Sequence, residues 1–229
     1  MRRGPRRVGF TRLDPADEPE PDQSVRWASC ATLIQSKFRR HRVVFGDLGP
    51  TLFSRKGGGE ADYGELFFPK QGEAGKFITV SDSTSTMLLA NFMERYWKLS
   101  RPEVLISVTG GAQDFVLSSR LQRVFDRGLV SAASSTNAWV VTGGTDTGVM
   151  KLVGTAFHQY GLSVPLIAFT PHGCVKGRKA FDGARKGFQT YNCDEKAAHD
   201  GAPLNPHHTH FVLVDSGLQG APAWGTEIR

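Results

Sequence analysis

The chain has 229 residues, of which 39% are hydrophobic and 22% charged, proportions typical of a soluble globular protein with a packed core. Three cysteines without a close pair (Cys30, Cys174 and Cys193) argue against a disulfide framework or a cysteine zinc site. No signal peptide follows the Arg-rich start, and the longest apolar run, 164–169, is far below the roughly 20 residues that cross a bilayer, so we expect no membrane span in this chain.

The net charge of +6 is concentrated at the start of the chain. Residues 1–60 hold 12 Lys/Arg and 7 Asp/Glu (a net of +5), whereas residues 61–229 hold 16 and 15 (a net of +1). Because a nucleic-acid-binding domain usually carries positive charge on its folded surface, we expect no nucleic-acid partner. Residues 1–25 are predicted to be a disordered basic and Pro/acid-rich tail, either solvated or in contact with anionic lipid or an acidic partner.

Residues 26–60 are predicted to form a basic segment that ends in a glycine linker, Gly57–Gly59. Its apolar residues have partly helical spacing. The run Ile34–Arg40 resembles the first half of a calmodulin-binding IQ motif, but Val44 stands where the second basic residue is expected. Calmodulin, a lipid surface and a chance match all remain open.

From residue 61 onward the pattern predicts alternating strands and helices. Two short strands are expected within 61–80, and four more at 103–108, 138–141, 164–169 and 209–214. Helices are expected at 83–99, 117–136 and 147–160, and loops over 171–206. Strands that are apolar throughout and alternate with helices indicate a parallel sheet covered on both faces, so the predicted fold class is α/β and Rossmann-like.

Two of the predicted strands end in the same tripeptide. These are Thr109-Gly110-Gly111 and Thr142-Gly143-Gly144. Ligands of open parallel sheets bind beyond the carboxyl ends of the strands, where glycines admit a ligand close to the backbone and the next helix presents N–H groups to a phosphate. The second turn adds the hydroxyls of Thr145 and Thr147 and a third glycine, Gly148. One Gly-Gly turn is most often only a tight turn, but two matching copies favour ligand binding.

Other chemistries fit less well. Neither turn is followed by Gly-Lys-Ser/Thr or matches G-x-G-x-x-G, which argues against kinase, ATPase and dehydrogenase functions. Asp215 ends a predicted strand and is a further candidate site residue. Ser216 is not in a nucleophile-elbow context, and Cys174 has no companion base.

The histidine-rich run Asn205–His210 is the one stretch that looks like a metal site. It immediately precedes a strand, and zinc also needs a third ligand and supporting partners. The sequence therefore assigns no metal and favours a hydrogen-bonded turn here.

Two long segments resemble the first amino-terminal homology region of melastatin-type (TRPM) cation channels. They are KFITVSDST…FMERYWKLSRPEVLISVTGGAQDF…LQRVFDRGLVSAASSTNAWVVTGGTDTGVMKLVG and NPHHTHFVLVDSGLQGAPAWGTEI, which lie within residues 61–228. The resemblance implies a SLOG-type Rossmann-like domain, a group that includes LOG phosphoribohydrolases. In ADP-ribose-gated TRPM channels this region binds the ligand. The implied contacts are Thr109, Gly110, Gly111, Ala112, Gly143, Gly144, Thr145 and Thr147, with Trp224 near the adenine.

The chain departs from the family pattern in three ways. Trp224 replaces a more usual tyrosine, which keeps a stacking surface but loses a hydroxyl. The chain stops at Arg229, before the helix and strand that complete the family's sheet, so we expect residues 61–229 to form a sheet truncated at its C-terminal end. No pore helices follow in this sequence.

The resemblance implies a regulatory domain at the cytoplasmic face of a plasma-membrane channel. In the family the channel is a homotetramer, and the implied partners are the remaining channel polypeptide and neighbouring subunits. The expected function is sensing an ADP-ribose-like nucleotide for a calcium-permeable channel, without catalysis or a cofactor. One alternative is a soluble LOG-type enzyme that uses Asp146, and another is a purely architectural domain.

Overall fold

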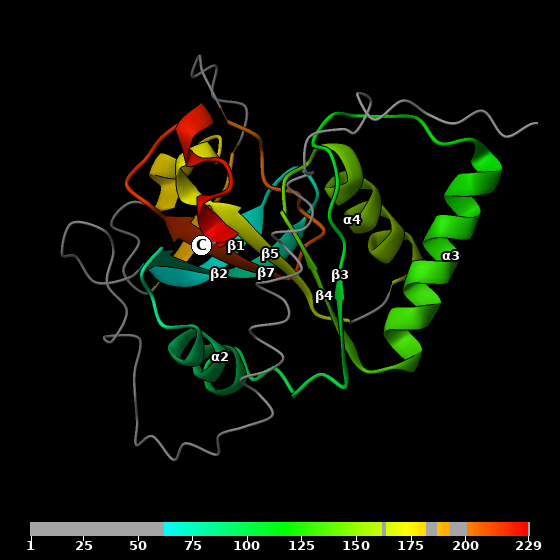
Figure 1. Ribbon diagram of the computed structural model, residues 1–229, viewed down its shortest axis with the longest axis horizontal. Helices are drawn as coiled ribbons and strands as arrows, with labels where there is room; N and C mark the ends of the chain where they lie inside the picture. Colours follow the sequence, from blue (N-terminus) through cyan, green and yellow to red (C-terminus); the bar gives the residue numbers. More distant parts are fainter. Residues whose placement is uncertain (1–61, 162–163, 182–186, 193–200, 229) are drawn as a thin grey trace, which may run out of the picture.

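The computed structural model describes residues 62–161, 164–181, 187–192 and 201–228, so the predicted tail (1–25) and IQ-like segment lie outside the described residues. The described part contains a seven-stranded sheet with the order β3-β4-β5-β7-β2-β1-β6 (Figure 1). The strands are β1 Tyr63–Phe68, β2 Glu73–Ser81, β3 Val104–Ser107, β4 Ala138–Thr142, β5 Leu166–Pro171, β6 Gly187–Thr190 and β7 His210–Asp215. The helices are α2 Thr86–Arg95, α3 Ser119–Ser135 and α4 Gly148–Tyr160, with 3-10 turns η2 His172–Cys174, η3 Arg178–Phe181, η4 Ala221–Ala223 and η5 Thr226–Ile228.

Most neighbouring strands in the sheet are parallel. β3, β4, β5, β7 and β2 pair in parallel, β1 returns antiparallel to β2 as a hairpin, and β6 pairs in parallel with β1. Within the described residues the two edges of the sheet are therefore β3 and β6. This confirms the predicted α/β Rossmann-like class.

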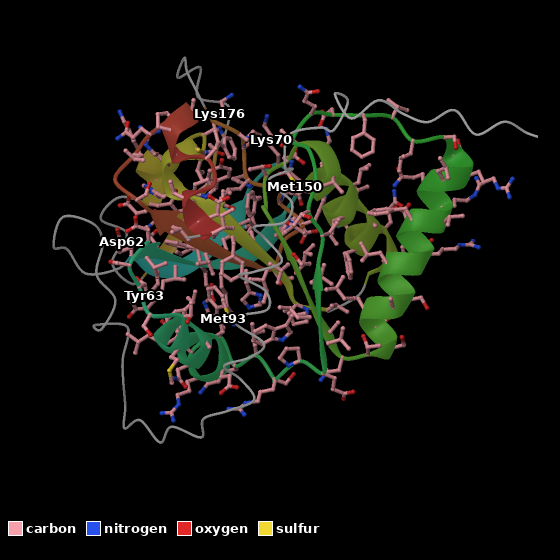
Figure 2. The ribbon with its side chains drawn as sticks, in the orientation of Figure 1. Asp62, Tyr63, Lys70, Met93, Met150 and Lys176 are labelled. Carbon is pink, nitrogen blue, oxygen red and sulfur yellow. The ribbon has the colours of Figure 1, made fainter. Side chains whose placement is uncertain are left out.

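Helices cover the sheet on opposite faces, as the apolar strands predict. α2 packs on one face through Leu89, Phe92 and Met93, and Figure 2 shows Met93 directed from α2 toward the sheet. α3 and α4 pack on the other face, where their core includes Val140 and Leu166. The rest of that face is covered by the segment between β5 and β7, whose core residues include Val175, Phe181, Tyr191 and Leu204.

Three local features differ from the sequence-based prediction. α2 ends at Arg95 instead of Leu99, and Lys98 has a left-handed φ of +59°, which does not continue a right-handed helix. β6 lies in the stretch that was expected to be loops. On α3, the sequence predicts one apolar side made of Leu121, Val124, Phe125, Leu129 and Val130, but Leu121 and Val124 remain 56% and 64% exposed.

The described helices do not include one with the length and apolarity that a membrane crossing needs.

Candidate functional site

The structure brings the two glycine turns together at the amino end of α4. β3 and β4 are parallel neighbours, so both turns leave the same edge of the sheet. A side chain at Gly148 would overlap the carbonyl oxygen of Gly111, and the Val149 amide donates to that oxygen at 3.4 Å. Gly148 also has a φ of +52°. Glycine is thus required at 148 because the first turn packs directly on the helix start.

Many of the hydrogen-bond donors and acceptors of the second turn are engaged in bonds that hold the turn in place. The Gly144 amide donates to Thr142 Oγ1 at 2.9 Å, and the Thr170 hydroxyl donates to the Gly143 carbonyl at 2.7 Å. The Asp146 amide donates to the Pro203 carbonyl, and the hydroxyls of Thr145 and Thr147 bond to each other at 2.9 Å. These groups hold the shape of the turn, so fewer of its donors remain for a ligand than the sequence suggests.

A buried polar network supports the second turn from within the fold. Thr142 Oγ1 lies 2.7 Å from His208 Nε2, and His208 Nδ1 lies 3.0 Å from Asn205 Oδ1. The amide nitrogen of Asn205 donates to Asp146 Oδ1 at 2.8 Å. Burial lowers the pKa of His208 to about 3, so the ring is neutral, with Nδ1–H donating and Nε2 accepting. Two residues of the histidine-rich run therefore stabilise the glycine turn.

An acidic side chain occupies the anion position at the start of α4. Thr147, the N-cap residue, makes no cap with its side chain. The Gly148 amide instead donates to Asp114 Oδ1 at 2.7 Å, and Lys151 Nζ lies 3.7 Å from Asp114 Oδ2. A carboxylate here interacts favourably with the helix dipole, as a phosphate would. Sequence reasoning missed Asp114, although an acid three residues after a Gly-Gly turn is a visible signal.

Asp215, at the carboxyl end of β7, lines a small polar pocket. The pocket has a volume of about 190 Å³, and its lining residues are His172, Gly173, Arg178, Asp215, Gly217, Leu218 and Gln219. Asp215 Oδ1 accepts from the Gly217 amide at 2.9 Å, and Arg178 Nη2 donates to Gln219 Oε1 at 2.5 Å. Pockets for whole small-molecule ligands usually measure roughly 300–1,000 Å³, so this one suits a phosphate or a sugar. Arg178 was also missed, although it lies in a basic run, KGRK, after β5.

Trp224 lies at the end of η4 and is 44% exposed. Its ring is accessible to solvent, but it does not line the pocket of Asp215. The structure therefore leaves Trp224 available for stacking without placing it in that pocket.

The sulfur of Cys174 is not suited to nucleophilic catalysis. The residue is fully buried, and burial together with the nearby Glu227 carboxylate raises the pKa of its thiol to about 12. A catalytic thiol needs a lowered pKa, because the thiolate is the reactive form. The raised pKa keeps the sulfur of Cys174 in its less reactive thiol form.

The fold and these turns define the class of protein. A Rossmann-like sheet with glycine turns and a helix amino end at its carboxyl edge is the α/β architecture whose ligands bind beyond the carboxyl ends of the strands. Residues 75–229 match the family model "SLOG in TRPM", and this chain belongs to that family.

The relatives are much longer proteins. The chain is 38% identical over 175 residues to transient receptor potential cation channel subfamily M member 2 of Rattus norvegicus, covering 72% of this chain and 12% of the relative. It is 39% identical over 176 residues to subfamily M member-like 2 of Nematostella vectensis, covering 72% and 11%. A transient receptor potential channel of Caenorhabditis elegans is 35% identical over 157 residues, covering 67% and 8%. The chain thus spans about a tenth of their length, and their names describe channels and not enzymes.

Proposed function

We propose that this chain is a ligand-sensing regulatory domain of a TRPM-like, calcium-permeable cation channel. In this proposal it lies at the cytoplasmic face, contacts the remaining channel polypeptide and neighbouring subunits of a homotetramer, and binds an ADP-ribose-like nucleotide. The IQ-like segment Ile34–Arg40 remains a predicted calmodulin contact.

The observation that carries the sensing role is the meeting of the two glycine turns at the start of α4. Helix amino ends bind phosphate because their N–H groups lack intrahelical acceptors and carry partial positive charge. Here Lys151 adds a full positive charge close to the Gly148 amide through their shared contact with Asp114. The first turn is exposed at Gly110, Gly111 and Ala112, so a ligand can approach its backbone.

Binding of a phosphate at this position requires the Asp114 carboxylate to move away. Asp114 has a side chain that is 64% exposed, so it can turn into solvent with little loss of packing. The phosphate would then take over the contacts with Gly148 and Lys151. The pocket of Arg178 and Asp215 at the same edge would hold a second polar part of the ligand, and Trp224 would offer a stacking surface for its base.

The proposed role is binding without catalysis. Asp146, the acid considered for a LOG-type reaction, has a carboxylate oxygen engaged by Asn205 at 2.8 Å. That contact belongs to the network that supports the second turn. A structural role accounts for Asp146 without a catalytic one.

Calorimetric titration of the full chain with ADP-ribose tests the proposal. We expect saturable binding, and we expect Gly111→Ala to weaken it by at least roughly tenfold. A methyl group at Gly111 would meet no atom of the described residues closer than 4.0 Å, but it would obstruct a ligand that approaches the turn.

Gly128→Ala is the matched control, because Gly128 lies on α3 with open space around it. It should bind like the unsubstituted chain. Absence of binding at millimolar ADP-ribose, or equal affinities for Gly111→Ala and Gly128→Ala, would contradict the proposed site.

A further inference from the structure

A second cluster of polar side chains lies at the opposite edge of the sheet, where the parallel strands begin. It consists of Glu73, His158 and His207. Glu73 is the first residue of β2, His158 lies in the last turn of α4, and His207 lies in the turn just before β7. Since α4 begins at the carboxyl edge and returns to the amino edge, this cluster is separate from the candidate nucleotide site.

The three side chains are close enough to share one ion. His158 Nδ1 lies 3.1 Å from Glu73 Oε1, and the rings of His158 and His207 stack with centroids 4.1 Å apart. One ligand atom from each residue lies within 4.8 Å of the other two. This proximity joins elements that are far apart in the sequence, so it arises only from the fold.

His207 has a ring nitrogen that the described residues leave unsatisfied. Its Nδ1 atom is buried and has no hydrogen-bond partner among them, which is uncommon for a buried polar atom. Its backbone amide donates to Asn205 Oδ1 at 3.1 Å, so the turn holds the residue in place. Burial, and secondarily the charge of His158, lower the pKa of His207. A buried, unpartnered ring nitrogen next to a histidine and a carboxylate is an available ligand atom for a metal ion.

The neighbouring histidines have other roles. His208 is fully buried between Thr142 and Asn205, and His210 Nδ1 lies 2.8 Å from Thr209 Oγ1 beside the ring of Trp97. Within the run Asn205–His210, only His207 therefore joins Glu73 and His158. The other two ligands, which the sequence did not reveal, come from β2 and α4.

We propose that Glu73, His158 and His207 bind a zinc ion that links β2, α4 and the start of β7. Two imidazole nitrogens and one carboxylate oxygen are a ligand set that zinc accepts, with water in the fourth position. Metal–ligand bonds of about 2.0–2.1 Å in a tetrahedron place the ligand atoms roughly 3.3 Å apart. The Glu73–His158 pair is already close to that separation. The rings of His158 and His207 stack, so the exposed His158 ring has to rotate until the nitrogen lone pairs of both rings converge on the ion.

Zinc titration of the full chain, after chelator treatment and removal of the chelator, tests this site. We expect one zinc ion per chain bound at the cluster and a higher midpoint of thermal unfolding in its presence, because a ligand that binds only the folded state stabilises it. Glu73→Gln, His158→Gln and His207→Gln should each lower zinc affinity by more than the roughly 10–100-fold that loss of an outer-shell partner causes.

Two substitutions serve as matched controls. Glu65→Gln removes the same charge from an exposed position on β1, and Gln159→Ala alters the exposed residue next to His158. Both should bind zinc like the unsubstituted chain. Equal zinc binding by the three site variants would show that the ion binds elsewhere and would overturn the proposal. Absence of zinc binding at about 100 µM would also overturn it and leave the cluster as an ion pair with a stacked histidine. If His207→Gln fails to fold, the zinc affinities of Glu73→Gln and His158→Gln, at two half-exposed positions, still test the proposal.

Discussion

The two glycine turns share the tripeptide Thr-Gly-Gly but have different environments. The first turn follows β3, an edge strand whose residues are half-buried or exposed, and Gly110 and Gly111 are themselves exposed. The second turn follows β4, which is buried along its whole length, and Gly144 is buried beneath neighbouring strand residues. The same tripeptide therefore forms an accessible turn after β3 and a buried turn, packed inside the fold, after β4.

The difference shows what each glycine is for. Gly144 has a φ of +72°, and a side chain there would overlap Ala168 and approach Thr170 Oγ1 to 2.9 Å. Gly111 has no positive φ, and among the residues that the structure describes the nearest atom to an added methyl group lies 4.0 Å away. Folding explains the glycine at 144. It does not explain the glycine at 111, which is therefore the better candidate for direct contact with a ligand.

The largest expected effect comes from Gly144→Ala compared with Gly111→Ala. Gly144→Ala combines a left-handed backbone with overpacking against Ala168, so we expect it to lower the free energy of unfolding by roughly 3–5 kcal/mol. Gly111→Ala should change it by less than about 0.5 kcal/mol. Urea unfolding followed by circular dichroism measures both. Similar losses in the two variants would mean that the turns have the same structural role.

A second prediction concerns how the stability of the fold depends on pH through two buried histidines, His208 and His210. Burial lowers the pKa of His208 to about 3 and that of His210 to about 4, so both are neutral when folded. With an unfolded value near 6.5, their stabilising contribution is complete above pH 6.5 and is lost as the pH falls toward 4. Glu227 acts in the opposite direction, because burial raises its pKa to about 7 and the folded state keeps its proton between about pH 4.5 and 7.

As the pH falls from 6.5 to 4.5, the two histidines destabilise the folded state more than Glu227 stabilises it. We expect the free energy of unfolding to decrease by roughly 3 kcal/mol over this range. Urea unfolding at several pH values measures this loss. Since His208 bonds to Thr142 under the second turn, acid should also lower the protection factor of the Gly144 amide against hydrogen exchange more than that of the Gly111 amide. His208→Gln, which takes up no proton, should flatten the pH dependence. An unfolding free energy that stays constant over this range would contradict the proposed role of the buried histidines.

The sequence predicts the fold well where local patterns and long-range contacts agree. β4 and β7 lie within about one residue of their predicted ends, because uninterrupted apolar runs mark strands that are buried on both faces. β6, with the sequence GFQT, has no such run and pairs only with β1 in the described structure. Its strand conformation depends on that partner, which a local pattern does not reveal.

The site is predictable to the same degree. That the two turns meet follows from parallel strands ending at one edge. The position of Asp114 after the first turn marks it as a candidate, but its contact with the Gly148 amide depends on the path of the loop, which the sequence does not show. The cluster of Glu73, His158 and His207 is hidden for a related reason. Its members come from three elements, and only His207 belongs to a recognisable run.

The smallest expected effect isolates the loop of the first turn. Asp114→Ala removes the carboxylate that competes with a phosphate for the Gly148 amide and Lys151, so ADP-ribose should bind roughly twofold to fivefold more tightly, the range of a single charge at a helix amino end. Calorimetry measures the change, and Glu103→Gln, at an exposed position before β3, is the charge-matched control. Weaker binding by Asp114→Ala would mean that the carboxylate holds the first turn in its ligand-binding conformation. In that case the loop after β3 would be a support like the second turn, and the contrast between the two turns would disappear.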